Sequence, residues 1–395
     1  MKKKVLILCL SCVMVIAALA GCVSQPPAYS EGDTGTAPST SSDSGAKVEG
    51  SGEGFVIGFS NGYVGNIWRQ DLMDTAERRL QAYKNEGVVA DYQITNANDD
   101  VTEQQNHINA LINQGCDAII IDPNSATALA SVIKTAVDKG ILVVICNDVA
   151  AYDGTYSIGT DYPGQHEITA NWFVRAMDEE GDTVYISGVP GNPSDTVRNV
   201  VQEEVFSHYP NIHVLAEAPG YWSDAEAQSA LSNFLSTYDS LKGIITQDGM
   251  GNGLLQAYAN AGIEPGIIIG DANGTFFKHW DEIGSDNLRN ICVPSPASVG
   301  GWSVDFTIGL LQGREIADGA LSPNPTNASM VNHVLVDIQY AVVNNEDLTN
   351  DFAAWMKENY PNCELITLDE ALVRTKDIPD GYVLGYDLPF DQIFK

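Results

Sequence analysis

The segment CDAIIIDPNSATALASVIKTAVDKGILVVICND, residues 116–148, decides the fold class of this 395-residue chain. Two short apolar runs enclose a stretch in which apolar residues recur every three or four positions up to Gly140. Short apolar runs are typical of buried strands, and this spacing with a closing glycine is typical of a helix. The segment therefore predicts a strand, a crossover helix and a second, parallel strand.

The same alternation continues on both sides of this segment. Towards the N-terminus, strands are expected at 54–60 and 89–97, each followed by a helical stretch. A second series of alternating helices and strands starts near Asp161. Two such series in tandem predict an α/β fold of two Rossmann-like lobes with parallel sheets, each sheet covered by helices on both faces, and a cleft between the lobes.

The N-terminus has the pattern of an export signal. Three lysines precede the apolar run Val5 to Ala20, whose 16 residues fall short of the roughly 20 that span a bilayer. The run ends in LAGC, which resembles the lipobox of bacterial lipoproteins and implies a signal over 1–21 and a lipid anchor on Cys22. A plain secretory signal, in which Cys22 has no role, is the alternative. Residues 22–53, rich in Ser, Thr, Gly and Pro, are expected to form a flexible tether.

Composition excludes several classes of partner. With 52 Asp and Glu against 20 Lys and Arg, the net charge of −32 repels nucleic acid and anionic lipid. Two of the seven cysteines lie in the signal, and those beyond Cys22 form no CxxC pair and have no His at metal-ligand spacing, so no metal site is predicted. One disulfide stays possible in an exported protein. The cysteines concerned are Cys116, Cys146, Cys292 and Cys363.

Nucleotide and hydrolase motifs are missing from the sequence. The first predicted strand is followed by SNGYVGN rather than a G-x-G-x-x-G turn, and neither a P-loop nor a G-x-S-x-G elbow occurs. The six histidines are scattered, each without a partner at fixed spacing. No cofactor is therefore expected, and the sequence favours a protein without catalytic activity.

Polar and aromatic residues gather instead where the predicted strands end. In parallel α/β sheets ligands bind at those ends. Amides, carboxylates and a guanidinium hydrogen-bond hydroxyl groups, and tryptophan faces stack on sugar rings, so this inventory suits a polyhydroxylated ligand. The residues found there are Ser60, Asn61, Asn66, Trp68, Asp122, Asn147, Asp148, Asn192, Arg198, Tyr221, Trp222, Gln247, Asp248, Asp271, Pro294 and Ser295.

Seven stretches between residues 54 and 338 resemble, in the same order, the landmarks of type I periplasmic (solute-)binding proteins of the ribose- and galactose-binding kind. They are VIGFSNGYVGNIW, INQGCDAIIIDPNSATAL, VVICND, SIGTDYPGQ, NPSDTVR, ITQDGMGNGLLQAYANAG and IIIGDANG. The resemblance implies a monomeric, extracytoplasmic protein, anchored by its lipid, whose lobes close on one monosaccharide or related polyol. The closed form would be presented to an ABC permease.

The resemblance also implies the residues that hold the sugar. Asn147 and Asp148 stand where ribose-type members carry Asp and Arg, and Pro294 stands where they carry Gln, so a ligand other than ribose is indicated. The ligand-binding set is Ser60, Asn66, Trp68, Asn147, Asp148, Arg198, Trp222, Gln247 and Asp271.

Several of these residues also fit purely structural roles. Asn66 could cap a helix, Trp68 could lie in the core, and Asp271 could form a turn. Of the neighbours Gln247 and Asp248, one is expected to face the cleft and the other to cap helix 249–261. Asp122, which precedes a proline, is interpreted as a turn residue.

The same resemblance implies a hinge of three crossings, near Gly159–Asp161, Val293–Ser295 and Met330–Val334. The first lobe would comprise 54–160 and 295–332, the second 161–294 and 333–340, with 341–395 as a C-terminal extension of unknown role. Two other functions stay open. The chain could be a lobe that reports a sugar or autoinducer to a signalling receptor, or a glycoside hydrolase that uses Asp148 with Asp271.

Overall fold

The computed structural model describes residues 54–379, 381–386, 388 and 390–395. The predicted signal peptide, Cys22 and the tether lie outside the described residues. No described helix is long and apolar enough to cross a membrane.

The first lobe is built on a seven-stranded sheet in the order β11-β12-β5-β4-β3-β1-β2. All its neighbours pair in parallel except β11 and β12, which are antiparallel. The strands are β1 (Phe55–Asn61), β2 (Val89–Asn96), β3 (Ala118–Asp122), β4 (Leu142–Cys146), β5 (Tyr156–Thr160), β11 (Ser322–Asn324) and β12 (Asn327–Val336).

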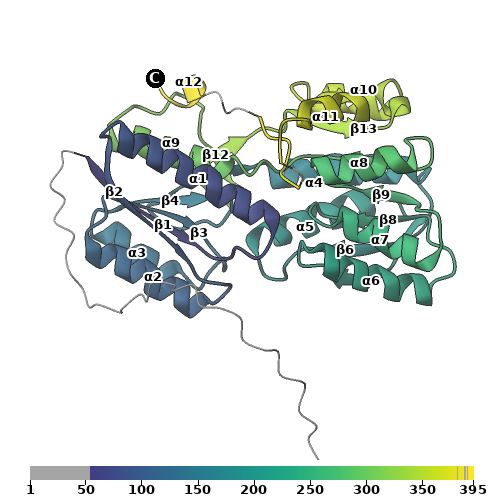
Figure 1. Ribbon diagram of the computed structural model, residues 1–395, viewed down its shortest axis with the longest axis horizontal. Coiled ribbons are helices and arrows are strands. Elements are labelled where there is room, and N and C mark those ends of the chain that lie inside the picture. Colours follow the sequence, from purple (N-terminus) through teal and green to yellow (C-terminus); the bar gives the residue numbers. More distant parts are fainter. Residues whose placement is uncertain (1–53, 380, 387, 389) are drawn as a thin grey trace, which may run out of the picture. The chain divides into compact units, whose positions relative to one another are not determined.

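Helices cover both faces of this sheet (Figure 1). Because side chains alternate along a strand, Ile120 of β3 packs towards α1 and α9, and its neighbour Ile121 packs towards α2 and α3. The helices are α1 (Ile67–Asn85), α2 (Val101–Gln114), α3 (Ala130–Asp138) and α9 (Val299–Leu311).

The second lobe repeats this plan with the order β14-β13-β10-β9-β8-β6-β7. Only β10 and β13 are antiparallel neighbours. Its strands are β6 (Gly181–Ser187), β7 (Ile212–Pro219), β8 (Gly243–Thr246), β9 (Ile267–Ile269), β10 (Asn290–Cys292), β13 (Tyr340–Val343) and β14 (Glu364–Ile366). One face carries α4 (Tyr162–Ala176), α5 (Pro193–Ser207) and α10 (Asp351–Asn359), and the other α6 (Asp224–Thr237), α7 (Gly251–Ala261), α8 (Gly274–Ile283) and α11 (Leu368–Thr375). The predicted α/β fold of two lobes is confirmed.

The third crossing differs from the sequence-based expectation. The first crossing follows β5 at Asp161, and the second runs from β10 to α9. The expected third crossing at 330–334 falls inside β12, which stays paired with β5 as far as Val336 opposite Thr160. Because these backbone hydrogen bonds hold 333–336 in the first lobe, the chain crosses at 337–339 instead.

The C-terminal extension contributes to both lobes. Strands β13 and β14 widen the second sheet, and α10 and α11 pack on it. The chain then returns to the first lobe, where α12 (Phe390–Ile393) begins and Phe394 is buried (Figure 1). The C-terminal end thus contacts both lobes in addition to the three crossings of the hinge.

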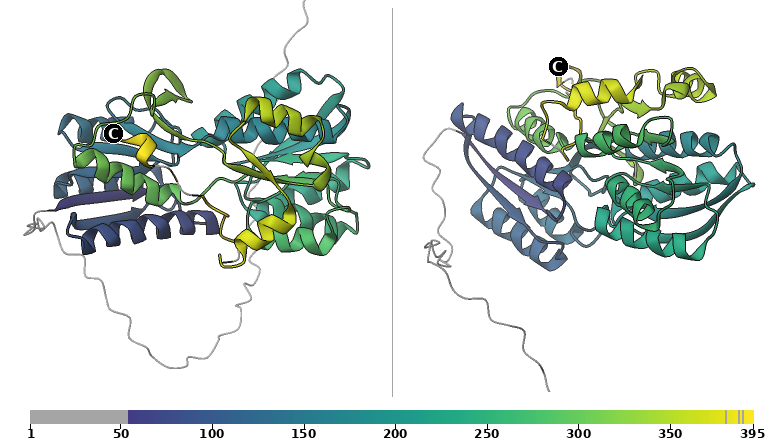
Figure 2. Two further views of the ribbon diagram at one scale, coloured as in Figure 1. Left: turned by 90° about the horizontal axis from the view of Figure 1, so that it is seen from above. Right: turned by 45° about the vertical axis from the view of Figure 1, so that its right-hand side comes forward.

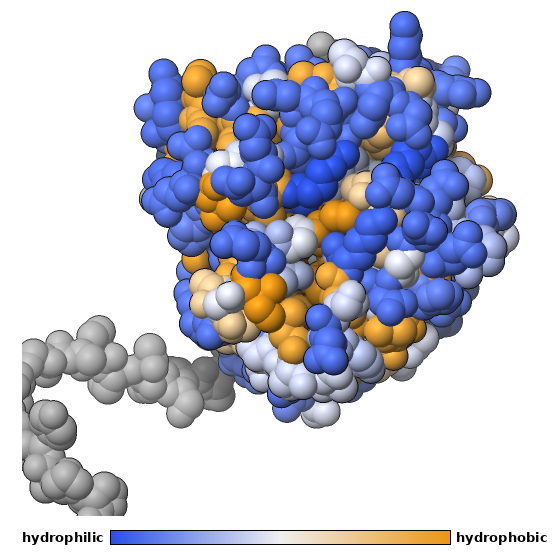
Figure 3. Space-filling model, turned by 90° about the vertical axis from the view of Figure 1, so that its right-hand side faces the viewer, coloured by the Kyte–Doolittle hydropathy of each residue, from blue (hydrophilic) through white to orange (hydrophobic). Residues whose placement is uncertain are grey.

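The surface of the second lobe agrees with the excess of acidic residues in the sequence. Figure 3 shows the end of the molecule formed by the second lobe, where hydrophilic side chains dominate and apolar ones are scattered between them.

All four cysteines of the described chain are free thiols, three of them buried and Cys363 half-buried. Burial raises the pKa of Cys146 to about 12, so its thiol stays protonated and behaves as a small core side chain.

Candidate functional site

The two lobes meet where the carboxyl ends of their strands face each other, and Asp148 lies at the centre of this contact. Asp148 follows β4, and its carboxylate accepts hydrogen bonds from Asn192 Nδ2 at 3.1 Å and Ser194 Oγ at 2.9 Å. Both donors lie at the start of α5 in the second lobe. A first-lobe carboxylate is thus held by second-lobe amide and hydroxyl groups, and we call this region the interlobe site.

Asp148 is fully buried, and burial raises the pKa of its carboxyl. The positive charge of Arg69 and the hydrogen bond from Ser194 oppose this rise. Its neighbour Asn147 has a left-handed backbone with φ 65, which turns the chain sharply after the strand. The Asn147 side-chain oxygen accepts a hydrogen bond from the hydroxyl of Tyr162, the first residue of α4.

Arg198 on α5 is the centre of the second-lobe side. Its Nη1 lies 2.9 Å from Asp248 Oδ1, and its Nη2 donates to Gln165 Oε1 at 2.7 Å. The guanidinium carbon lies 4.2 Å from the centroid of the Tyr162 ring, so the cation rests on an aromatic face. Arg198 Nε is buried without a hydrogen-bond partner. The guanidinium is therefore fixed in place and keeps one donor unused.

Gln247 ties Trp222 into the same network. Its Oε1 accepts from Trp222 Nε1 at 2.8 Å and from Arg198 Nη1 at 3.3 Å. Its Nε2 donates to Tyr185 Oη and to Asp195 Oδ1, both at 2.9 Å. Because both ends of the amide are occupied, Gln247 orients its neighbours.

The first-lobe wall contains a buried ion pair. Arg69 of α1 pairs with Asp122 at the end of β3 and donates to Asn61 Oδ1 at 3.3 Å. Burial lowers the pKa of Arg69, and the negative charge of Asp148 opposes this. The interpretation of Asp122 as a turn residue is wrong, because it is the last residue of β3 and its fully buried carboxylate pairs with Arg69.

Three further candidates have structural partners. Asn66 caps α1 by accepting from Arg69 N at 2.8 Å. Trp68 is half-buried, and its Nε1 donates to Ser295 O in the second crossing at 2.6 Å. Ser60 is fully buried on β1, and its hydroxyl has no partner.

Asp271 holds the start of α7. Its oxygens accept from Gly249 N at 2.7 Å, Met250 N at 3.1 Å and Gly251 N at 2.9 Å. Burial raises its pKa to about 7, and the negative charges of Asp224 and Asp248 add to the rise. The expectation that Gln247 or Asp248 caps this helix is wrong, because Asp271 does so from the loop that follows β9 (Ile267–Ile269).

The network joins some of the candidate residues and leaves others apart. Asn147, Arg198, Trp222 and Gln247 are joined directly or through Tyr162 and Gln165, and Trp68 reaches the hinge beside them at Ser295. Asp148, next to Asn147 in the chain, bonds Asn192 and Ser194 at the start of the helix that carries Arg198. Ser60, Asn66 and Asp271 have other surroundings. Sequence reasoning did not select Arg69, Tyr162, Gln165 and Ser194, and it named Asp248 at a strand end without including it in the ligand-binding set. The position of Tyr162 and Gln165 just after the first crossing was the available signal for those two.

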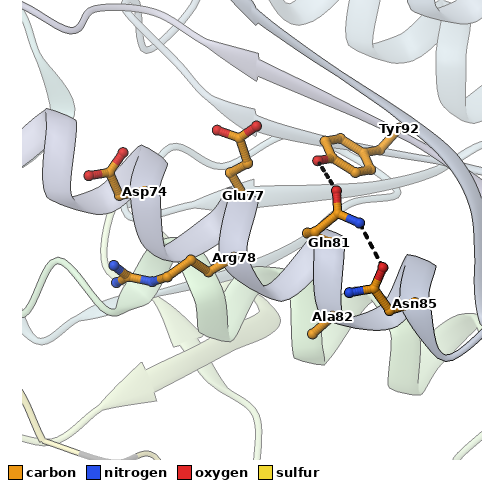
Figure 4. A pocket seen from close by; sticks show the side chains of 7 residues that line it. All are labelled: Asp74, Glu77, Arg78, Gln81, Ala82, Asn85 and Tyr92. Atoms are coloured by element: carbon orange, nitrogen blue, oxygen red, sulfur yellow. Dashed lines mark hydrogen bonds between the residues drawn. The ribbon is translucent and has the colours of Figure 1, made fainter.

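A small hollow lies on the second-lobe side of the site. It is lined by Gln165, Arg198, Gln247 and Asp248 and measures about 10 Å³, which is close to the space of one water molecule. A wider hollow of about 470 Å³ lies elsewhere, open to solvent beside α1 and β2 (Figure 4). It is lined by Asp74, Glu77, Arg78, Gln81, Ala82, Asn85 and Tyr92, which play no part in the network.

Comparison with known proteins agrees with this architecture. The chain is 32% identical over 179 residues to the xylitol-binding protein of Mycolicibacterium smegmatis, covering 44% of this chain and 51% of that protein. It is 26% identical over 201 residues to a D-apiose import binding protein of Paraburkholderia graminis, covering 50% and 62%. The chain thus spans less than two thirds of these two relatives. With the ribose import binding protein of Bacillus subtilis it shares 22% identity over 308 residues, covering 77% and 93%.

A solved ABC transporter solute binding protein from Thermobispora bispora has the same fold. Its TM-score is 0.64 at 22% identity, and the match covers 85% of this chain and 99% of that one. The sequence model of the periplasmic binding protein domain matches residues 57–315. That range is well over half of the 395 residues, so the chain belongs to the periplasmic binding protein family.

Proposed function

We propose that this chain is a substrate-binding protein of an ABC importer that captures a monosaccharide or related polyol between its lobes. The observation that carries the proposal is the interlobe site, in which Asp148 of one lobe meets Asn192 and Ser194 of the other. A ligand that hydrogen-bonds both walls shifts the chain towards the closed form, which a permease can recognise. The relatives named for binding xylitol, apiose and ribose support this class of ligand.

The charges of the site favour an uncharged ligand. Arg69 is paired with Asp122 and Arg198 with Asp248, so neither guanidinium is left to neutralise an anion. Asp148 adds a third carboxylate whose hydrogen-bond donors are all uncharged. A sugar acid or sugar phosphate would bring further negative charge into a buried acidic site, at a high electrostatic cost. Hydroxyl groups, which donate to carboxylates and accept from guanidinium, suit it better.

We assign ligand contacts to Asp148, Arg198, Trp68 and Trp222, with the tryptophans stacking on the sugar ring. Asn147 and Gln247 then position Tyr162, Arg198 and Trp222 through the hydrogen bonds described above. Asn66 and Asp271 keep the helices at the site in place, and Ser60 supports β1. The function is binding without catalysis, because Asp148 and Asp271 serve separate hydrogen-bond networks.

The proposed location is outside the cytoplasm. Cys22 would carry the lipid, and residues 22–53 would give the folded part freedom to reorient above the membrane. Metabolic labelling of the full-length chain with a fatty acid tests this, with Cys22→Ala as the matched variant. Label that persists in the variant would contradict the anchor.

A thermal-shift screen tests the ligand class. Neutral pentoses, hexoses, pentitols and inositols are compared with the corresponding sugar acids. A ligand at 100 times its dissociation constant stabilises the folded form by about 2.7 kcal/mol. Stabilisation by a neutral compound, which is recovered unchanged after long incubation, is expected. Stabilisation by the acids alone, or conversion of the compound, would contradict the proposal.

A further inference from the structure

The C-terminal segment that follows α11 connects the lobes outside the hinge. Residues 316–395 lie beyond the region that matches the family. In the view from above the C-terminal chain, drawn in yellow, passes from α11 on the second lobe to α12 on the first (Figure 2, left). We call residues 381–386 together with 390–395 the C-terminal strap.

One part of the strap is attached to the second lobe. Val383 forms an antiparallel bridge with Asn273, the residue that caps α8, and Leu384 N donates to Ala272 O at 2.9 Å. Leu384 is buried in the second-lobe core, and its carbonyl accepts from the Tyr340 hydroxyl.

The end of the strap is attached to the first lobe. Phe394 is buried against Phe306 of α9, with ring centroids 5.6 Å apart. It also bridges to Ile316, and Ile393 O accepts from Ala317 N at 2.8 Å. The two ends of the strap are thus fixed to different lobes.

Between these ends, two tyrosines contact the lobe boundary. The Tyr382 hydroxyl donates to Asp74 Oδ2 of α1 at 2.9 Å, although its neighbour Val383 is bonded to the second lobe. The Tyr386 ring lies between Trp302 of the first lobe, at 5.8 Å, and Tyr340 of the second, at 6.1 Å.

Tyr386 is also close to the hinge itself. Burial raises the pKa of its hydroxyl, and the carboxylates Asp337 and Asp161, which lie in the third and first crossings, add to this rise. A rotation of one lobe against the other therefore separates the first-lobe and second-lobe residues that contact Tyr386.

The covalent length of the chain between α11 and α12 does not by itself keep the lobes together. Between Thr375, where α11 ends, and Phe390, where α12 begins, there are 14 residues, which can extend to roughly 50 Å. Any restraint on opening must come from the non-covalent contacts, of which the exposed Tyr382–Asp74 bond is the easiest to break.

We propose that the C-terminal strap is a clasp that favours the closed form of the lobes, through the Tyr382–Asp74 hydrogen bond and the position of Tyr386 between Trp302 and Tyr340. When the lobes open, each end of the strap stays with its own lobe, and these contacts across the boundary separate. This inference requires that the lobes open and close, but it does not depend on which ligand they bind.

The clasp is tested by measuring the distance between the lobes without ligand. Spin labels are placed at two exposed positions, Asp138 in the first lobe and Glu204 in the second, after both are changed to cysteine. Tyr382→Phe removes only the hydroxyl that reaches Asp74. We expect it to raise the ratio of open to closed form roughly two- to tenfold, the range set by one hydrogen bond.

Tyr238→Phe is the matched control, because the Tyr238 hydroxyl bonds Leu215 O within the second lobe. It should leave the distance distribution unchanged. Tyr386→Leu should open the lobes further than Tyr382→Phe, and Asp74→Ala should add nothing to Tyr382→Phe. If Tyr386→Leu fails to fold, the distances between the lobes in Tyr382→Phe still test the proposal. Distances in Tyr382→Phe equal to those of the parent chain would overturn the proposal.

Discussion

Replacing Asp148 by asparagine separates the role of this residue in closure from any role in folding. The change keeps the size of the side chain and one acceptor oxygen, which can still serve Ser194. It turns the other oxygen into an NH₂ group that faces the Asn192 amide donor. A charge-assisted hydrogen bond between the lobes is therefore lost in the closed form, whereas the open form loses no such bond.

The size of the effect follows from that bond. A hydrogen bond to a charged group contributes about 1.5–3 kcal/mol, which corresponds to a roughly 10- to 150-fold rise in the ligand dissociation constant. The thermal stability of the unliganded chain should not fall, because burial already disfavours the Asp148 charge, as its raised pKa shows.

Isothermal titration calorimetry with the ligand found in the screen measures this effect, and calorimetric melting of the unliganded protein measures stability. Asp153→Asn, at an exposed position in the turn after β4, is the control with the same loss of charge. Unchanged affinity in Asp148→Asn would show that the Asp148 hydrogen bonds do not stabilise the closed form. An affinity loss that is matched by a large drop in melting temperature would contradict a role of Asp148 in closure rather than in folding.

Three further predictions follow from the same contacts. Gly188→Ala would place a Cβ 2.3 Å from the Trp222 ring, so the ring must move and affinity should fall roughly three- to tenfold, the range for an aromatic contact; titration that shows wild-type affinity would argue against stacking by Trp222. Arg69→Met leaves the buried Asp122 carboxylate unpaired and should lower the free energy of unfolding in urea by about 3–5 kcal/mol; Asp122→Asn in the same chain should restore much of this, and no recovery would speak against the ion pair. The pKa of Asp271 is raised from 3.8 to about 7, so the folded chain holds a proton that the unfolded chain has released, and this residue makes stability fall as pH rises from about 4 to 7. Stability measured against pH should fall less steeply in Asp271→Asn than in the parent, and parallel curves would be inconsistent with the raised pKa.

The fold could be predicted because its signals are local. Each strand of the 116–148 unit is a continuous apolar run, and the helix between them ends at Asp138, shortly before Gly140, whose φ of 79 suits a glycine. The third crossing had no such local signal. Residues 333–336 continue β12 without a glycine or proline to mark an end, so only the pairing with β5 reveals where the strand stops.

The site was predictable where it depends on strand ends and unpredictable where it depends on distant partners. Asn147 and Asp148 follow β4 directly, and both are in the network. Arg69 and Asp122 are 53 positions apart, and nothing local indicates that two charged residues meet in a buried pair. Asp271 follows a strand end as expected, yet its oxygens are used by backbone amides at the start of α7, the helix that precedes it in the chain.

The C-terminal extension shows the same limit. Its aromatic residues gave no periodic pattern, and only the fold reveals that Tyr386 lies between the two lobes.

The central claim, capture of an uncharged polyol at the interlobe site, is tested most directly by one calorimetric comparison. The wild-type protein is titrated with xylitol, ribose and other neutral sugars from the screen, and then with the carboxylate derived from the best of them. At least one neutral compound is expected to bind saturably to a single site, and its carboxylate at least tenfold more weakly. Equal or tighter binding of the carboxylate, or no binding of any neutral sugar or polyol, would contradict this claim.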